Sequence, residues 1–166
     1  MYHSSPLPEE DVSYALYKAA KEDKCLQVVS WQAVDGKSYF ATDIKLRLPN
    51  GERAEPDLII ASSRLVWLIE VKSLHSESIA DEIKLKTLLE GCSHESLLNL
   101  ISLHSGIDVT KKMLEGCVAY SLDDTAGPVQ CSHLIGHIEW PKTRANDEKF
   151  GDLLNRLERT IHDPSG

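Results

Sequence analysis

The chain has 166 residues, of which 42% are hydrophobic and 27% charged, and its formal net charge is −8. This length and composition predict a single globular domain from residue 1 to residue 166, and no apolar run approaches the roughly 18 to 20 residues of a membrane-spanning helix. The acidic balance counts against a protein that coats nucleic acid nonspecifically, because such binding relies on clustered lysine and arginine.

The first residues and the cysteines bear on the compartment. The opening stretch MYHSSPLPEED has no basic segment followed by an apolar one, so no secretory signal is predicted. None of the four cysteines belongs to a CxxC pair, and neither a zinc ribbon nor a redox motif is expected. We therefore expect a cytoplasmic protein with free thiols and no membrane partner.

The first half of the chain predicts one helix followed by strands. Apolar residues recur at helical spacing from Glu9 to Asp23. Strands are expected at Leu26 to Val34, Tyr39 to Leu48, Glu55 to Ala61 and Leu65 to Lys72. Turns are expected at Asp35-Gly36, at Pro49 to Glu52 and at Ser62 to Arg64.

The second half changes to a helical period. Helical segments are expected from Ser76 onward, with interruptions near Gly91 and Gly106. Further on, the expected elements are one or two helical turns at Asp108 to Leu114, strands at Cys117 to Leu122 and Ser132 to Trp140, and a closing helix at about residues 147 to 162. This order predicts a mixed α/β domain, in which helices flank a sheet.

The segment EPDLIIASSRLVWLIEVKS places charged residues in apolar strands. Side chains alternate between the two faces of a strand, so Glu70 and Lys72 share a face, and a hairpin folded about its central turn sets Asp57 opposite Glu70. Directly opposed residues have Cβ atoms about 4.5 to 5.5 Å apart, so two carboxylates there would repel and one pKa would rise. A divalent cation would resolve the repulsion, and Mg²⁺ favours one or two carboxylates plus waters and phosphate oxygens. The ammonium of Lys72 can then hold the attacking water or neutralise charge on a phosphoryl group.

Pro56-Asp57, followed after twelve residues by Glu70-Val71-Lys72, resembles the PD-(D/E)xK signature of restriction-endonuclease-like nucleases. The resemblance implies that Asp57, Glu70 and the main-chain oxygen of Val71 bind Mg²⁺, with Mn²⁺ as a substitute. It implies that Lys72 is catalytic, together with Asp57 and Glu70. It also implies a core order of helix, three strands, helix and strand (α-β-β-β-α-β), which is similar to the order of the predicted elements.

Two further sets of residues are candidates for the site. Many members of this family add a glutamate on the first helix, where Glu10 and Glu9 are available; Glu10 is preferred, and a pair of solvated acids is the alternative. On the helix after the motif, Lys84 and Lys86 are candidates for contact with a nucleic-acid backbone, although no family role transfers to them.

These features predict a Mg²⁺-dependent phosphodiesterase that hydrolyses DNA, as an endonuclease rather than an exonuclease. The alternative is a catalytically degenerate subunit of the same fold that acts as a protein-interaction module. The acidic balance favours a protein partner that supplies affinity for nucleic acid, and a homodimer through the apolar stripe from Phe150 to Ile161 is also open. A third interpretation is a structural salt bridge, since Lys72 would face Glu55 in the same register.

Overall fold

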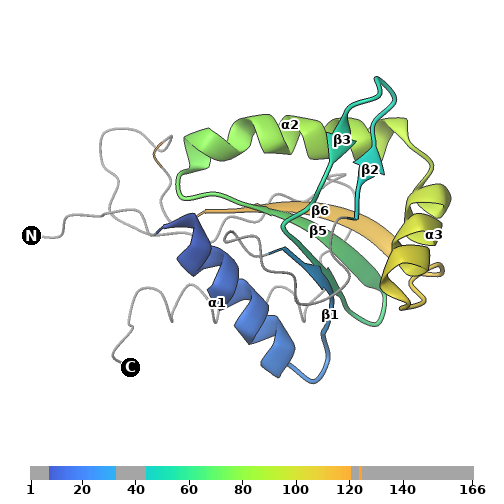
Figure 1. The fold of residues 1–166 in the computed structure, drawn as a ribbon, viewed down its shortest axis with the longest axis horizontal. Helices are drawn as coiled ribbons and strands as arrows, with labels where there is room; N and C mark the ends of the chain where they lie inside the picture. The colour runs from blue at the N-terminus through green and yellow to red at the C-terminus, as the bar shows by residue number, and fades with distance from the viewer. Residues whose placement is uncertain (1–7, 33–43, 121–123, 125–166) are drawn as a thin grey trace, which may run out of the picture.

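The computed structural model describes residues 8–32, 44–120 and 124, which form three helices, a four-stranded mixed sheet and a two-stranded ribbon (Figure 1). In chain order the elements are α1 (Glu9–Glu22), β1 (Gln27–Trp31), β2 (Leu46–Arg47), β3 (Arg53–Ala54), β4 (Leu58–Ala61), β5 (Leu65–Val71), α2 (His75–Gly91), α3 (His94–Ser105) and β6 (Met113–Ala119). The sheet has the order β1-β4-β5-β6, and β2 pairs with β3 in the ribbon. The expected mixed α/β class is therefore confirmed.

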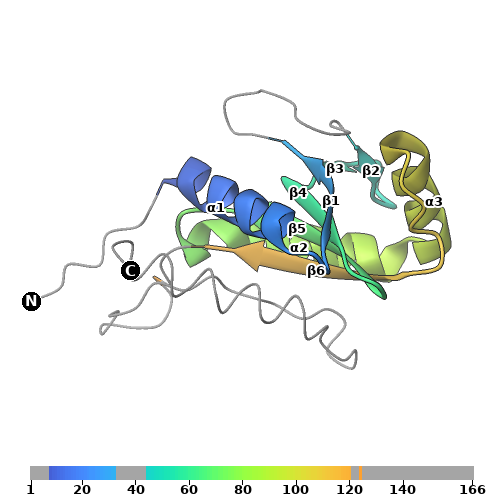
Figure 2. The ribbon, with the colours of Figure 1, turned by 90° about the horizontal axis from the view of Figure 1, so that it is seen from below.

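Helices cover both faces of the sheet, with α1 on one face and α2 and α3 on the other (Figure 2). Successive residues of β5 serve the two layers in turn, because side chains alternate along a strand. Trp67 and Ile69 are buried in the α1 layer, whereas Val66 and Leu68 are buried in the α2 and α3 layer. This double burial explains why β5 is almost continuously apolar in sequence.

The hairpin of β4 and β5 has the register that the sequence predicts. Its two middle pairs join Ile59 to Leu68 and Ile60 to Trp67, and its strands are antiparallel. The turn closes where the main-chain nitrogen of Ser62 donates to the oxygen of Leu65 at 2.8 Å. The next pair beyond the ladder is Asp57 and Glu70, so both residues belong to the face that α2 covers.

The predicted strand from Glu55 to Ala61 is wrong in its first part. Strand structure is interrupted between β3 and β4, where Pro56 has no main-chain N–H to donate to a ladder. Of the predicted strand from Tyr39 to Leu48, the described part is a strand only at β2, and β2 pairs with β3. The turn at Asp35-Gly36 lies outside the described residues.

The prediction of helix between Asp108 and Leu114 is also wrong, because β6 begins at Met113. β6 runs parallel to β5, and Met113 is aligned with Leu65. The main-chain nitrogen of Met113 donates to the oxygen of Arg64 at 2.8 Å. Hydrogen bonding to a strand far away in sequence therefore outweighs the local helical pattern.

Three predictions for the last part of the chain lie outside the described residues. They are the strand expected at Ser132 to Trp140, the closing helix at about residues 147 to 162 and the stripe from Phe150 to Ile161.

Within the described ranges, no helix combines the length and the apolar character that a membrane crossing requires.

Candidate functional site

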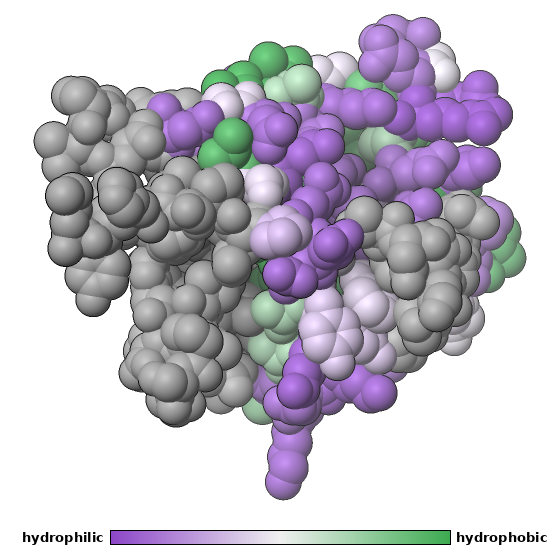
Figure 3. Space-filling view, turned by 60° about the vertical axis from the view of Figure 1, so that its left-hand side comes forward, coloured by the Kyte–Doolittle hydropathy of each residue, from purple (hydrophilic) through white to green (hydrophobic). Residues whose placement is uncertain are grey.

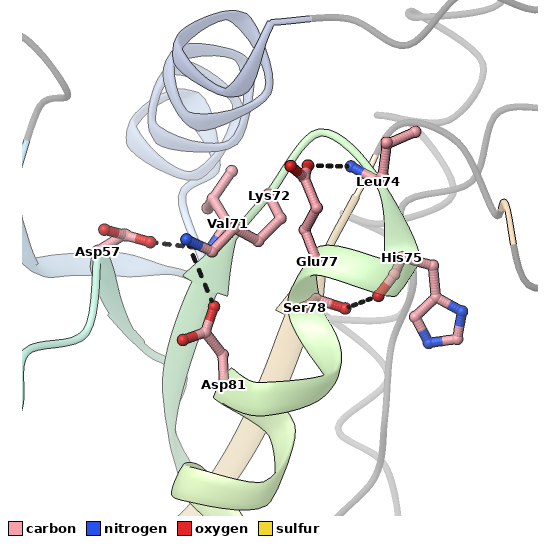
Figure 4. A network of polar contacts seen from close by, with 8 residues as sticks. All are labelled: Asp57, Val71, Lys72, Leu74, His75, Glu77, Ser78 and Asp81. Carbon is pink, nitrogen blue, oxygen red and sulfur yellow. Dashed lines mark hydrogen bonds and ion pairs between the residues drawn. The ribbon is translucent and has the colours of Figure 1, made fainter.

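Asp57 connects three strands at one end of the sheet. Its main-chain oxygen accepts a hydrogen bond from the nitrogen of Gln32 at 2.9 Å. Its side-chain Oδ2 accepts one from the main-chain nitrogen of Val71 at 2.8 Å (Figure 4). The carboxylate therefore takes the place of a main-chain acceptor beside β5, directly after Pro56 has interrupted the neighbouring strand.

Asp57 and Glu70 form a half-buried pair of carboxyl groups. Burial above all, and then the negative charges of Asp57 and Asp81, raise the pKa of Glu70 to about 10, against the opposing effect of Lys72. Burial also raises the pKa of Asp57, although the Val71 N–H, a hydrogen bond with Glu70 and the charge of Lys72 lower it. Two close carboxyl groups that resist joint ionisation are the arrangement that the predicted register required.

Lys72 lies beside this pair and is held from the other side by α2. Its Nζ is 3.7 Å from Oδ2 of Asp81 (Figure 4), and its main-chain nitrogen donates to the oxygen of Ala119 at 2.9 Å. Burial alone would lower the pKa of Lys72, but the carboxylates of Asp81, Glu9, Asp57 and Glu70 together raise it. The ammonium is therefore charged at neutral pH.

The first helix contributes Glu9 rather than the preferred Glu10. Burial raises the pKa of Glu9, as do the charges of Asp57 and Asp81, and Lys72 lowers it, whereas Glu10 is exposed. Helical phase explains the difference, because Glu9 precedes the buried Val12 by three residues and Leu16 by seven. The same spacing in the sequence could have identified Glu9.

The helix α2 adds residues that the motif did not indicate. Glu77 and Asp81 are four residues apart, so they lie on one face of the helix, and Oε1 of Glu77 also accepts from the nitrogen of Leu74 at 3.2 Å. Lys84 is half-buried and lies three residues after Asp81, next to the same face, whereas Lys86 is exposed and lies further round the helix. Whether Lys84 and Lys86 contact nucleic acid stays a prediction.

Five carboxylates and one lysine thus gather where the first turns of α1 and α2 meet the last residues of β5 (Figure 1). We call them the carboxylate cluster: Glu9, Asp57, Glu70, Glu77 and Asp81. With this end of the sheet turned forward, hydrophilic side chains form a band across the molecule (Figure 3).

The donor set of the cluster fits Mg²⁺. Asp57 and Glu70 supply two carboxyl groups, and the main-chain oxygen of Val71 lies on the same strand edge as the N–H that Asp57 binds. Oδ2 of Asp81 is buried, and among the described residues it has the ion pair with Lys72 but no hydrogen-bond partner. In the described ranges, no three His, Cys, Asp or Glu side chains converge into a complete metal site. Mg²⁺ keeps several waters and needs only one or two protein carboxylates.

Comparison with known proteins does not add to this description. No family model matches the chain, and no curated protein and no solved structure matches it. The function is therefore inferred from the chemistry of the carboxylate cluster and Lys72.

Proposed function

We propose that this protein is a Mg²⁺-dependent phosphodiesterase that hydrolyses DNA. The observation that carries the proposal is the half-buried pair of Asp57 and Glu70 with the charged Lys72 beside it. A structural salt bridge explains this arrangement less well, because the single positive charge of Lys72 cannot neutralise the several carboxylates around it. The pair is costly to keep unless a cation or a function compensates.

The element order supports a restriction-endonuclease-like fold as the finer description. The order is α1, then three antiparallel strands β1, β4 and β5, then α2, and last β6 parallel to β5. This is the order that the resemblance of the motif implies. The ribbon of β2 and β3 and the helix α3 are additions to that core.

Each residue of the site has a separate task in the proposed reaction. Asp57 and Glu70 would hold the metal with the main-chain oxygen of Val71, and the hydrogen bond from the Val71 nitrogen fixes the carboxylate of Asp57. When bound, Mg²⁺ stabilises charge on the phosphate oxygens and lowers the pKa of a bound water. Lys72 presents a charged ammonium to the negative charge that develops on the phosphoryl group, and Asp81 holds its position.

Cleavage assays test the proposal directly. Wild-type protein is incubated with supercoiled plasmid, linear duplex, single-stranded DNA and RNA, in the presence of Mg²⁺ or Mn²⁺. We expect nicked or linear plasmid, which an exonuclease cannot produce from a closed circle. Asp57→Asn and Lys72→Ala should each reduce the rate about a hundredfold or more. Folded protein that cleaves none of these substrates with either metal would defeat the proposal.

The second candidate is a degenerate nuclease-fold subunit that binds a protein. It is favoured by the net charge of −8 and by the excess of carboxylates over lysine at the site, both of which oppose a polyanionic substrate. In that case a partner protein or a second copy of the chain would supply affinity for nucleic acid, in the cytoplasm. The same variants separate the two candidates, because a degenerate subunit shows no metal-dependent cleavage.

A further inference from the structure

The ribbon of β2 and β3 has one face fixed to the protein body. Leu46 and Ala54 are paired across the ribbon and are completely or almost completely buried in the core layer of α2 and α3. Its turn contains Gly51 at a φ of 90°, and the side chain of Pro49 is so close to Gly91 that a Cβ there would lie 2.6 Å from Cγ of the proline. The ribbon is therefore a firmly seated element that projects beside α2 (Figure 1).

The opposite face of the ribbon carries an unfavourable pair of like charges. Lys45 and Glu55 make an ion pair across the ribbon at 3.9 Å. Arg47 and Arg53, the next directly opposed residues on this face, are both exposed. Within the described parts of the chain, neither guanidinium group forms a hydrogen bond or an ion pair. Like charges directly opposite each other destabilise a strand pair, so a local stability argument does not account for them.

We propose that Arg47 and Arg53 together bind a phosphate of a nucleic-acid backbone. Guanidinium groups bind phosphate oxygens through paired, charge-assisted hydrogen bonds, and a shared phosphate would remove the repulsion between the two side chains. The cationic pair also stands out in a protein whose net charge is −8.

The position of the pair suits a substrate of the carboxylate cluster. Arg53 precedes Asp57 by four residues, and four residues of extended chain span at most about 14 Å. A backbone whose scissile phosphate lies at Asp57 therefore has flanking phosphates near the ribbon. The choice of nucleic acid as the ligand rests on the proposed function, whereas the phosphate-binding chemistry of the pair does not.

Binding without cleavage tests this inference. The fluorescence anisotropy of a labelled DNA duplex is measured with the full chain in EDTA, at salt concentrations from about 50 to 200 mM. Arg47→Ala/Arg53→Ala is compared with the control Arg64→Ala/Lys111→Ala, which removes two exposed cations from the opposite end of the β4 and β5 hairpin. We expect the ribbon variant to bind about tenfold more weakly or worse, and its salt slope to fall by about 1. The control should bind like wild type.

A single charge reversal separates loss of binding from loss of folding. Arg47→Glu places a carboxylate opposite Arg53, so the melting temperature should be unchanged or higher while DNA binding is lost. Wild-type protein that does not bind the duplex, or equal loss in the ribbon and control variants, would overturn the inference. So would an acidic peptide that competes for the arginines better than DNA, because the ligand would then be a protein. If binding follows the arginines but no DNA is cleaved, the proposed function fails and this inference stands.

Discussion

Asp57 holds the strand that carries Glu70 and Lys72 through one carboxylate oxygen, which lies 2.8 Å from the main-chain nitrogen of Val71. The same carboxyl group is half-buried beside Glu70, and burial raises its pKa. Its hydrogen-bonding role and its charge therefore act in opposite directions on stability, and substitutions can separate them.

The first prediction compares two substitutions of Asp57 in the absence of metal. Asp57→Asn keeps an oxygen that can accept from Val71 and removes the charge next to Glu70, so the free energy of unfolding should be equal or higher. Asp57→Ala leaves the Val71 N–H without its acceptor and should lower that free energy by about 1 to 3 kcal/mol. Urea denaturation in EDTA measures both. An Asn variant as unstable as the Ala variant would show that the negative charge of Asp57 itself stabilises the fold, and would favour a structural salt bridge.

The second prediction concerns stabilisation by metal. An ion that binds only the folded protein stabilises it by about 2.7 kcal/mol when the ion concentration is a hundred times the dissociation constant. Thermal melts should show this gain for wild-type protein with Mn²⁺ or Mg²⁺, and no gain for Asp57→Asn. A wild-type melting temperature that does not respond to millimolar Mn²⁺ would count against a metal site at Asp57 and Glu70.

The third prediction is a pH dependence that Glu70 controls. Its pKa rises from the ordinary 4.5 to about 10 in the folded protein. The folded state thus holds this proton more tightly, so the contribution to stability is complete below about pH 4.5 and is lost as the pH rises toward 10. Glu70→Gln does not titrate, so in EDTA its advantage over wild type should grow between about pH 5 and pH 9. Parallel stability curves for the two proteins would contradict a half-buried, protonated Glu70.

The fourth prediction tests Asp81 as the residue that positions Lys72. Among the carboxylates that raise the pKa of Lys72, Asp81 has the largest effect. Asp81→Asn should therefore lower this pKa, as measured by an NMR titration of the Lys72 side chain, and should reduce the rate of DNA cleavage. Glu82→Gln on the neighbouring position of α2 serves as the control. An unchanged Lys72 titration in Asp81→Asn would show that the two side chains are not coupled.

The fifth prediction separates the two glutamates at the start of α1. Glu9 is half-buried toward Lys72, whereas Glu10 is exposed. Glu9→Gln should change the stabilisation of the protein by Mn²⁺, and Glu10→Gln should leave it as in wild type. The measurement is the shift in melting temperature on addition of metal. The opposite result, with Glu10→Gln alone affecting the shift, would restore the preference drawn from the sequence motif.

The sequence by itself determined the hairpin that carries Asp57 and Glu70. The apolar residues of both strands and the short turn between Ala61 and Leu65 leave one symmetrical pairing, and β4 and β5 adopt it. Local information suffices here because the two strands are adjacent in the chain and side chains alternate strictly along each of them. The motif residues could therefore be placed on one face before the structure was known.

Only the tertiary structure decided which other residues join the pair. Asp81 meets Lys72 because α2 packs across β5 and β6, a contact that depends on side chains far apart in sequence. β6 begins at Met113 because β5 offers a parallel partner there, which no local pattern records. The face of α1 that buries Val12 and Leu16 also turns Glu9 toward the site. The packing of the helix, and not the order of its acidic residues, therefore decides that Glu9 lies closer to Asp57 and Glu70 than Glu10 does.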